Sequence, residues 1–343
     1  MKKIKLIPIL FLLLFSLCSF SSCELIYDQK SEGRLILIGV GLDYMEDDGT
    51  SVNDKGLPNP TNDIREVAFA LSSLSENTNK EFFFIPMLQQ QTITTPDNNY
   101  PNKEKVNLLF DELINKTTIS ANVYKGNFDS DFSLISKFSS FGTLITMDPL
   151  NRNDTVIFYF CGHGETGNGD LRLPKDTNEQ DRESYSLDIL YSNISNLDSK
   201  SLVILDSCFS GTLIKESSTS INKAETPFVD RLPALYQKFF NYTDNNGIYE
   251  KFSIIASTKS DELSWPIKPS DLSHTNSIFT YYFLEALGYI SDIDIGEMSD
   301  SILSKKNNKI DIDSIYNYVN KNITGQQPII MGGRKSLVLF TFN

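Results

Sequence analysis

Two segments of the chain place a histidine and a cysteine directly after an apolar run. The first, residues 155–164, ends in Cys-Gly-His-Gly, and the second, residues 202–211, ends in Asp-Ser-Cys-Phe-Ser-Gly. A cysteine thiolate is a strong nucleophile once a neighbouring imidazole takes its proton. The spacing and order of the two motifs therefore predict covalent catalysis, with Cys208 as the nucleophile and His163 as the base.

The apolar runs before these motifs are typical of strands that are buried on both faces. They are short, rich in β-branched and aromatic residues, and bounded by glycine, as in a parallel sheet. In open α/β sheets the site lies just beyond the carboxyl ends of the strands. His163 and Cys208 both fall at such ends. We expect the two strands to be neighbours that deliver both side chains to one rim.

The two motifs resemble those of the caspase-like cysteine peptidases, and within them the metacaspase-like branch common in bacteria. That branch carries Ser-Gly-His-Gly after one strand and Asp-(Ser/Ala)-Cys-x-Ser-Gly after another, so this chain departs only at Cys161. The resemblance covers roughly residues 34–342. It implies an α/β, caspase-like (caspase–haemoglobinase) fold, with a mostly parallel sheet of about six strands and helices on both faces.

The resemblance also implies the activity of a cysteine-type endopeptidase, a hydrolase acting through an acyl-enzyme. His163 would move protons between the Cys208 thiol and the leaving amine, without a third catalytic side chain. Backbone N–H groups at Cys208 and around Gly164 are expected to hold the oxyanion. Ser257 and Trp265 resemble residues that line the substrate groove of the family, although a turn serine and a partly buried tryptophan explain them nearly as well.

An acidic pocket for a cationic side chain is a further implication of the resemblance. Asp206 stands two residues before Cys208, and strand alternation points both side chains the same way. Asp63 matches the second specificity carboxylate of the family, but an aspartate in the first turn of a helix is also favoured by the helix dipole. We expect a protein or peptide substrate cleaved after Arg or Lys, not after Asp.

Cys161 takes the place of the usual serine and, by the same alternation, points the same way as His163. Two interpretations stay open. Cys161 is either a drifted residue of the pocket wall or, outside the cytoplasm, a disulfide partner that reversibly silences Cys208.

No organic cofactor is implied, and no metal site is expected. Calcium activates many metacaspases. The acidic residues after the histidine motif, from Asp170 to Glu183, are scattered among basic residues and lack the alternation of an oxygen-ligand loop.

The amino-terminal residues have the layout of a secretory signal peptide. Lysines precede an apolar run at 6–17, and small residues then lead to Cys23 in a lipobox-like sequence. We expect a lipoprotein-type signal at 1–22, lipidation of Cys23, a tether at 23–33 and the peptidase domain at 34–343. The alternative is an ordinary cleaved signal. We expect the mature protein to be exported and lipid-anchored to a bacterial cell membrane, facing the periplasm or the cell surface.

Composition excludes some partners. The 343 residues carry a formal net charge of −13, which argues against nucleic acid. No later stretch is long and apolar enough to span a membrane. Four cysteines, one of them in the signal and one in the lipobox, do not make a disulfide scaffold.

The remaining pattern predicts alternating strands and helices. Strands are expected at 34–40, 82–88, 118–124, 155–160, 202–205, 252–256 and 336–342. Helices are expected at 103–115, 131–144, 187–197, 276–287 and 311–320, and from a cap at Thr61 or Asn62 to Leu74. An insertion is expected within 89–151. The second core strand is either 82–88 or 118–124, and the other belongs to the insertion.

Two functions other than hydrolysis remain compatible with these motifs. A membrane-tethered scaffold or binding module could keep the fold without turnover. A transpeptidase could open the same acyl-enzyme with an amine. Loss of activity after Cys208→Ala would separate the first of these from a peptidase.

Overall fold

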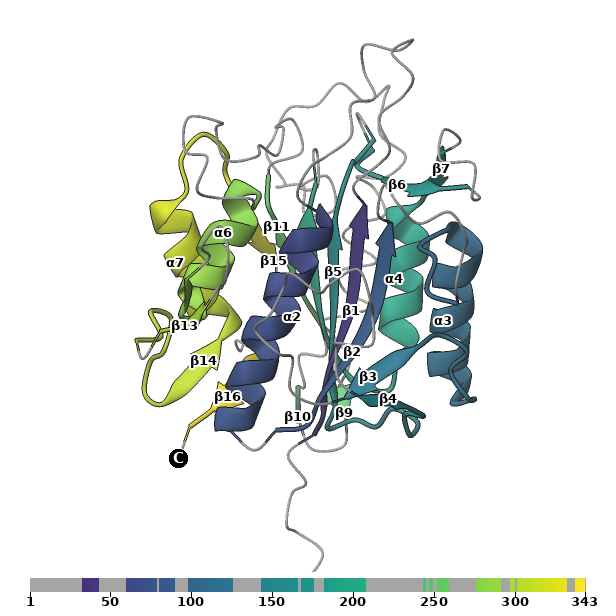
Figure 1. The fold of residues 1–343 in the computed structure, drawn as a ribbon, viewed down its shortest axis with the longest axis horizontal. Coiled ribbons are helices and arrows are strands. Elements are labelled where there is room, and N and C mark those ends of the chain that lie inside the picture. The colour runs from purple at the N-terminus through teal and green to yellow at the C-terminus, as the bar shows by residue number, and fades with distance from the viewer. Residues whose placement is uncertain are drawn as a thin grey trace, which may run out of the picture.

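A computed structural model describes most of the chain after the first strand begins. The described residues are 33–42, 60–78, 80–89, 98–125, 143–165, 168–175, 182–207, 243–244, 247–248, 252–258, 276–290, 297–299, 301–331 and 337–342. Their centre is one eight-stranded sheet with helices on both faces (Figure 1). No helix among these residues is long and apolar enough to cross a membrane.

The sheet has the strand order β15-β11-β8-β5-β1-β2-β3-β4. Its members are β1 (Leu35–Leu42), β2 (Phe82–Gln89), β3 (Val123–Lys125), β4 (Thr143–Ile145), β5 (Thr155–Cys161), β8 (Lys200–Asp206), β11 (Phe252–Ala256) and β15 (Ile329–Met331). The five strands β2, β1, β5, β8 and β11 run parallel to their neighbours. The three edge strands β3, β4 and β15 are antiparallel. The expectation of a mostly parallel sheet is confirmed.

The sheet is larger than the expected six strands, because three-residue edge strands leave too short a pattern to see in sequence. The predicted closing strand at 336–342 is also misplaced. Its observed counterpart β16 (Val338–Thr341) pairs with β14 (Lys309–Asp311) in a separate two-stranded sheet. The main sheet is closed instead by β15, which was not predicted.

The ambiguity over the second core strand is resolved by pairing. β2 runs parallel to β1 along its whole length, from Leu35 opposite Phe82 to Leu42 opposite Gln89. The other candidate, 118–124, contributes only the short antiparallel strand β3. The helix expected at 131–144 falls mainly on residues outside the described part, and its last residues belong to β4.

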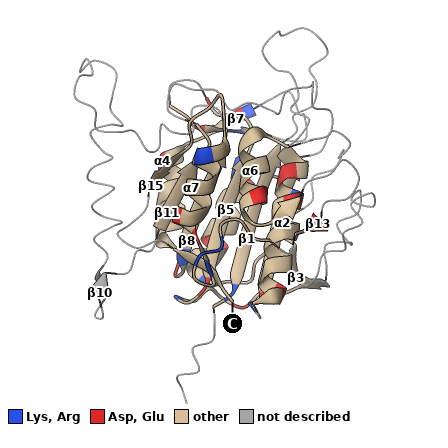
Figure 2. Ribbon diagram, turned by 90° about the vertical axis from the view of Figure 1, so that its left-hand side faces the viewer, with Lys and Arg blue, Asp and Glu red and all other residues tan. Residues whose placement is uncertain are grey.

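Two layers of helices cover the sheet. One face carries α2 (Pro60–Asn77), α6 (Ile278–Ala286) and α7 (Ile312–Asn322), which lie side by side in front of the strands in Figure 2. The other face carries α3 (Lys103–Asn115) and α4 (Leu187–Asn196). These helices confirm the predicted ones to within a few residues. α2 begins slightly earlier than expected because Pro60 suits the first turn of a helix.

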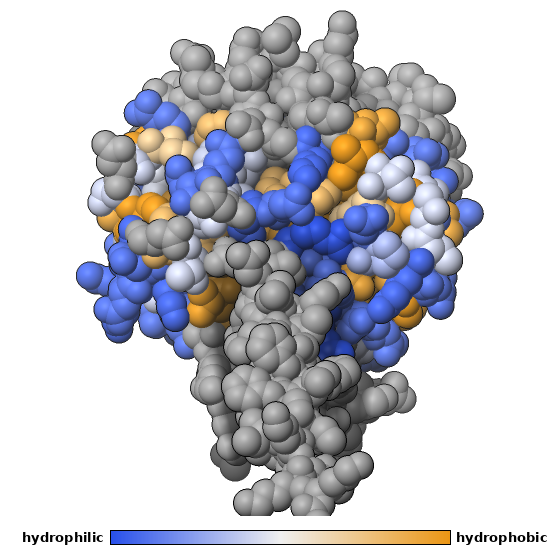
Figure 3. Space-filling model, turned by 90° about the horizontal axis from the view of Figure 1, so that it is seen from below, coloured by the Kyte–Doolittle hydropathy of each residue, from blue (hydrophilic) through white to orange (hydrophobic). Residues whose placement is uncertain are grey.

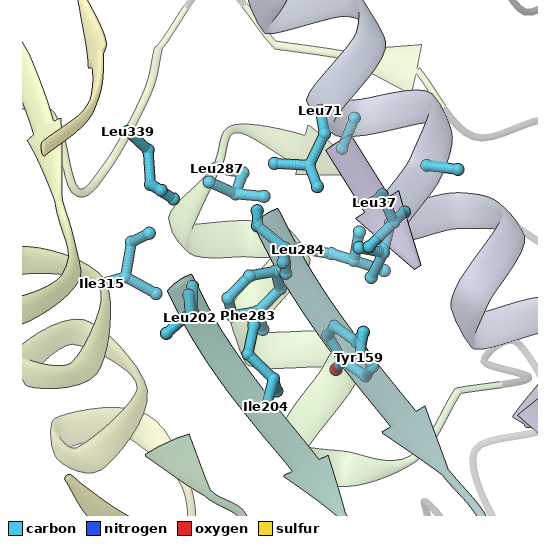
Figure 4. Close-up of a cluster of buried hydrophobic side chains, with 14 of the residues drawn as sticks. Leu37, Leu71, Tyr159, Leu202, Ile204, Phe283, Leu284, Leu287, Ile315 and Leu339 are labelled. Atoms are coloured by element: carbon cyan, nitrogen blue, oxygen red, sulfur yellow. The ribbon is translucent and has the colours of Figure 1, made fainter. Parts of the chain in front are cut away.

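Strand alternation divides the core into two separate apolar clusters. Leu35 and Leu37 of β1 point to the face of α2 and α6, whereas Ile36 and Ile38 point to the face of α3 and α4. On the first face, Tyr159 of β5 meets Phe283 of α6 edge to face, with ring centroids 5.7 Å apart (Figure 4). This packing holds α6 against the strands that carry the predicted site.

Two glycines let α2 approach β1 closely. A Cβ on Gly39 would lie 2.4 Å from Cγ2 of Ile64, and one on Gly41 would lie 2.7 Å from the backbone oxygen of Pro60. Any larger residue would push the amino end of α2 away from the sheet. The glycines therefore set the position of the first turn of α2, which contains Asp63.

At the opposite end of the sheet, a buried ion pair ties β1 to the start of β5. The Nη2 of Arg34 lies 2.6 Å from Oδ2 of Asp154, whose side chain is fully buried. Arg34 also donates its backbone N–H and its Nε to the other carboxylate oxygen. Seen from this end, the surface around the grey atoms is mostly hydrophilic, with hydrophobic residues in separate patches (Figure 3).

Candidate active site

The strands that carry the two motifs are neighbours in the sheet. β5 and β8 pair in parallel, with Cys161 opposite Asp206 at their carboxyl ends. The N–H of Gly162 continues the ladder by donating to the carbonyl of Asp206 at 3.2 Å. His163 thus leaves the sheet two residues beyond this pair on one strand. Cys208 follows two residues beyond it on the other, where it lies outside the described residues.

The histidine segment is fixed by a hairpin that sequence reasoning missed. β6 (Leu171–Pro174) and β7 (Arg182–Tyr185) pair antiparallel just after the motif. The N–H of Arg172 donates to the carbonyl of His163 at 3.1 Å, and Gly164 forms a bridge with Leu171. The hairpin is rich in polar residues, and the alternation of Leu171, Arg172 and Leu173 is too short a pattern to predict a strand.

Asp170 connects this hairpin to the next helix. One of its carboxylate oxygens accepts from the N–H of Leu187, at the start of α4, at 3.1 Å. The other accepts from the hydroxyl of Ser184 at 2.9 Å and from the amide of Asn168 at 3.0 Å. The loop that follows His163 is therefore tied to the body of the domain through the side chain of one aspartate.

Three of the predicted site residues come together beside this rim. One ligand atom each from Asp63, Cys161 and Asp206 lies within 4.8 Å of the others, and all three residues are buried. They come from three different elements: α2, β5 and β8. The Sγ of Cys161 donates a hydrogen bond to Oδ2 of Asp63 at 3.3 Å.

Asp63 is completely buried, and its hydrogen-bond partners within the described part of the chain are uncharged. The Nδ2 of Asn276 donates to Oδ1 at 2.8 Å, and the N–H of Ser277 approaches both carboxylate oxygens at 3.3 and 3.2 Å. Burial raises the pKa of Asp63 well above its ordinary value, and the negative charge of Asp206 raises that pKa further. A bound cation would relieve both effects.

Asp206 is held by the first turn of α6. Its Oδ2 accepts from the hydroxyl of Ser277 and, at 2.9 Å, from the hydroxyl of Thr280. The OH of Tyr159 lies 2.7 Å from the same Thr280 oxygen and extends the network into the core. Only 3% of Asp206 is exposed, so this carboxylate is a buried charge and not a surface charge.

Sequence reasoning missed the residues that support the two carboxylates: Glu66, Asn276, Ser277 and Thr280. Ser277 is the N-cap of α6, accepting the N–H of Thr280 at 3.0 Å, and a serine ahead of an apolar helix was a readable cap signal. Nothing local in the sequence indicates that this cap faces Asp63 and Asp206, because those contacts span more than 70 residues of chain.

The remaining predicted residues fall in different places. Ser257 is fully buried, and its hydroxyl donates to the carbonyl of Ser207 at 3.4 Å, next to the expected nucleophile. Thr258, which sequence reasoning also missed, donates to the same carbonyl at 3.3 Å. Trp265, Cys208 and Cys23 lie outside the described residues.

The carboxylates and the thiol could also serve as metal ligands. Among the residues that the structure describes, Asp63, Cys161 and Asp206 are the one group of three such side chains close enough to share an ion. Two oxygens and a sulfur suit a borderline cation such as Zn²⁺. A guanidinium or ammonium group is the other kind of cation that such a buried acidic pair accepts.

Comparison with known proteins gives one family and several solved structures. Residues 139–336 match the family described as the caspase domain of the C14 peptidases. No curated protein matches the sequence. A protein from Geobacter sulfurreducens is 14% identical, with a TM-score of 0.43 over 88% of this chain and 94% of that chain. Caspase-1 from Spodoptera frugiperda is also 14% identical, with a TM-score of 0.47 over 92% of this chain and 94% of that chain.

Proposed function

Because this chain belongs to the caspase-domain family of peptidases, we propose that it is a cysteine endopeptidase that hydrolyses peptide bonds after Arg or Lys. The family supports a cysteine peptidase acting on protein. The observation that carries the finer proposal is the buried pair Asp63 and Asp206, whose carboxylates lie beside the carboxyl ends of β5 and β8.

The proposed reaction uses the two residues that follow these strands. The Cys208 thiol transfers its proton to His163, and the thiolate attacks the scissile carbonyl carbon. Backbone N–H groups at Cys208 and around Gly164 stabilise the oxyanion. His163 then protonates the leaving amine, which leaves an acyl-enzyme. Water, deprotonated by His163, attacks the thioester and releases the acid, and the proton returns to the Cys208 sulfur.

The acidic pair supports selection of a basic side chain. The two carboxylates have oxygens within 4.8 Å of each other. Burial raises the pKa of Asp63, and the negative charge of Asp206 raises it further. An Arg or Lys side chain brings the missing positive charge, and the fork of Arg can bond to two carboxylate oxygens at once. An Asp side chain would add a third negative charge. The pocket therefore favours basic residues and rejects acidic ones.

A panel of fluorogenic peptides tests the proposal. The peptides differ only at the cleavage position, which carries Arg, Lys, Ala or Asp, and the full chain is assayed beside Cys208→Ala. We expect cleavage of the Arg and Lys peptides alone, and none with the variant. Preference for Asp would contradict the pocket. Turnover that survives Cys208→Ala would contradict the mechanism, and an inactive wild-type chain would favour a scaffold.

We further propose that the enzyme acts outside the cytoplasm, anchored by a lipid on Cys23. The support is the charged, apolar and small-residue order of residues 1–23. Metabolic labelling with a fatty acid analogue tests this, with Cys23→Ala as the control. Equal labelling of both chains would contradict the lipid anchor.

A further inference from the structure

We propose that Asn276 is a positioning residue of the basic-residue pocket, setting the affinity for the substrate side chain rather than the rate of the chemical step. The inference rests on the function proposed above. Asn276 is fully buried immediately before the N-cap of α6. Its Nδ2 donates to Oδ1 of Asp63 at 2.8 Å and to Oε2 of Glu66 at 2.6 Å.

A single amide nitrogen thus joins two carboxylates of α2. Asp63 and Glu66 are three residues apart, so they share one face of the helix, and both are buried. Hydrogen bonds to charged groups are stronger than those between neutral groups. An asparagine supplies both N–H bonds from one point, whereas an aspartate there would supply none and add a further negative charge.

The next residue extends the same connection to the second carboxylate. The N–H of Ser277 reaches Asp63, while its hydroxyl reaches Asp206. The amino end of α6, where the helix dipole is positive, therefore faces both acids. Together with Ser277, Asn276 holds this end of α6 against α2, and so it helps to fix Asp63 in relation to Asp206. Without the two hydrogen bonds of Asn276, the spacing of the acidic pair is held less firmly.

The experiment compares Asn276→Ala with Asn99→Ala in the full chain. Asn99 is a matched control because it is also buried, and its Nδ2 also donates twice, to the carbonyls of Pro86 and Asn122. The kinetic constants KM and kcat are measured with the Arg peptide. Alkylation of Cys208 by iodoacetamide reports the nucleophile without using the pocket.

We expect Asn276→Ala to raise KM by about tenfold to a hundredfold, the loss of hydrogen bonds to charged groups, with little change in kcat. The rate of Cys208 alkylation should stay that of the wild type. Asn99→Ala should lower the thermal unfolding temperature and leave KM unchanged. Asn276→Ser, which keeps one donor, should give an intermediate KM.

Other outcomes separate the two proposals. Wild-type enzyme that does not cleave after Arg or Lys would show the proposed function to be wrong, and the role of Asn276 with it. An active wild type with an unchanged KM in Asn276→Ala would overturn only the role of Asn276. A fall in kcat alone would do the same. Failure of both Asn276 variants to fold would assign the residue to domain stability and also overturn the proposal.

Discussion

The thiol of Cys161 donates a hydrogen bond to the Oδ2 of Asp63, at 3.3 Å, across the junction of β5 and α2. The metacaspase-like motif has a serine at this position. Cys161 therefore keeps a hydrogen-bond donor there, but a thiol is a weaker donor than a hydroxyl. The donor touches the more deeply buried of the two acids. Its strength affects the charge state of the pocket, because this hydrogen bond lowers the pKa of Asp63.

Replacing the thiol with a hydroxyl should extend activity toward acid. In Cys161→Ser the stronger donor lowers the pKa of Asp63, so the carboxylate stays ionised to lower pH. The acid limb of kcat/KM for the Arg peptide should move down in pH, and that of Cys161→Ala should move up. Identical profiles for all three chains would show that this contact does not affect the pocket.

Cys161→Ser also tests the hypothesis of a disulfide between Cys161 and Cys208. If oxidation joins the two sulfurs, wild-type enzyme loses activity under a mild oxidant and regains it with dithiothreitol, whereas Cys161→Ser resists rapid loss. Labelling of free thiols after each treatment measures the bond. Full wild-type activity without any reductant would contradict this regulation.

Asp63→Asn should lower the activity and raise the stability of the folded chain at neutral pH. The pKa of Asp63 is raised in the folded state, so the folded chain binds this proton more tightly than the unfolded chain does. Its contribution to stability is present below the unfolded pKa, about 3.9, and is lost as pH rises through the folded pKa. The amide of asparagine does not ionise, so the variant does not lose this stability as the pH rises.

The variant is therefore expected to unfold at a higher temperature than the wild type at pH 7 and at a similar temperature near pH 4, while its kcat/KM for basic peptides falls at least about tenfold. Thermal scans across this pH range check the first part. An equal loss of stability at both pH values would contradict the assigned pKa direction.

Gly41→Ala should weaken substrate binding by displacing α2, which carries Asp63. The added Cβ would lie 2.7 Å from the oxygen of Pro60 and 3.0 Å from the Cα of Thr61, both backbone atoms that cannot rotate away. The amino end of α2 must shift, and Asp63 moves with it. We expect a higher KM for the Arg peptide.

Gly325→Ala is the control for the glycine substitution. Gly325 has a φ of +87°, so alanine is strained there, yet a Cβ would meet nothing within 4 Å. This variant should lose about 1 kcal/mol of stability without a change in KM. If KM rises equally in both variants, the cause is general destabilisation and not a displacement of α2.

Breaking the ion pair at the other end of the sheet should affect stability alone. Asp154→Ala leaves the guanidinium of Arg34, whose side chain is 12% exposed, without its carboxylate. Removing one partner of a buried pair costs about 3–5 kcal/mol. Urea unfolding measures the loss, and kcat/KM per folded molecule should be unchanged. A loss below about 1 kcal/mol would place the pair among surface ion pairs.

The features that sequence predicted best were those with a local signature. Apolar runs marked the five parallel strands, and the two motifs at strand ends indicated that β5 and β8 are neighbours, which their register confirms. Periodicity and caps marked the helices. The edge strand β15 and the hairpin of β6 and β7 were missed because strands of three or four residues carry almost no pattern.

The hydrogen bonds that support the two acids could not be predicted from local sequence patterns, for a different reason. The bond from Asn276 to Asp63 joins residues 213 positions apart, and no property of either segment specifies the other. Cys161 and Asp206 lie close together because they are opposite each other at the carboxyl ends of the paired strands β5 and β8. The meeting of α2 and α6 above them follows only from the packing of the whole domain.

The pocket draws on α2, β5, β8 and the start of α6, which together span the chain from Asp63 to Thr280. A chain that ends before α6 lacks the hydrogen bonds of Asn276, Ser277 and Thr280 to the two acids. The proposed pocket is therefore complete only after nearly the whole domain has been synthesised and packed.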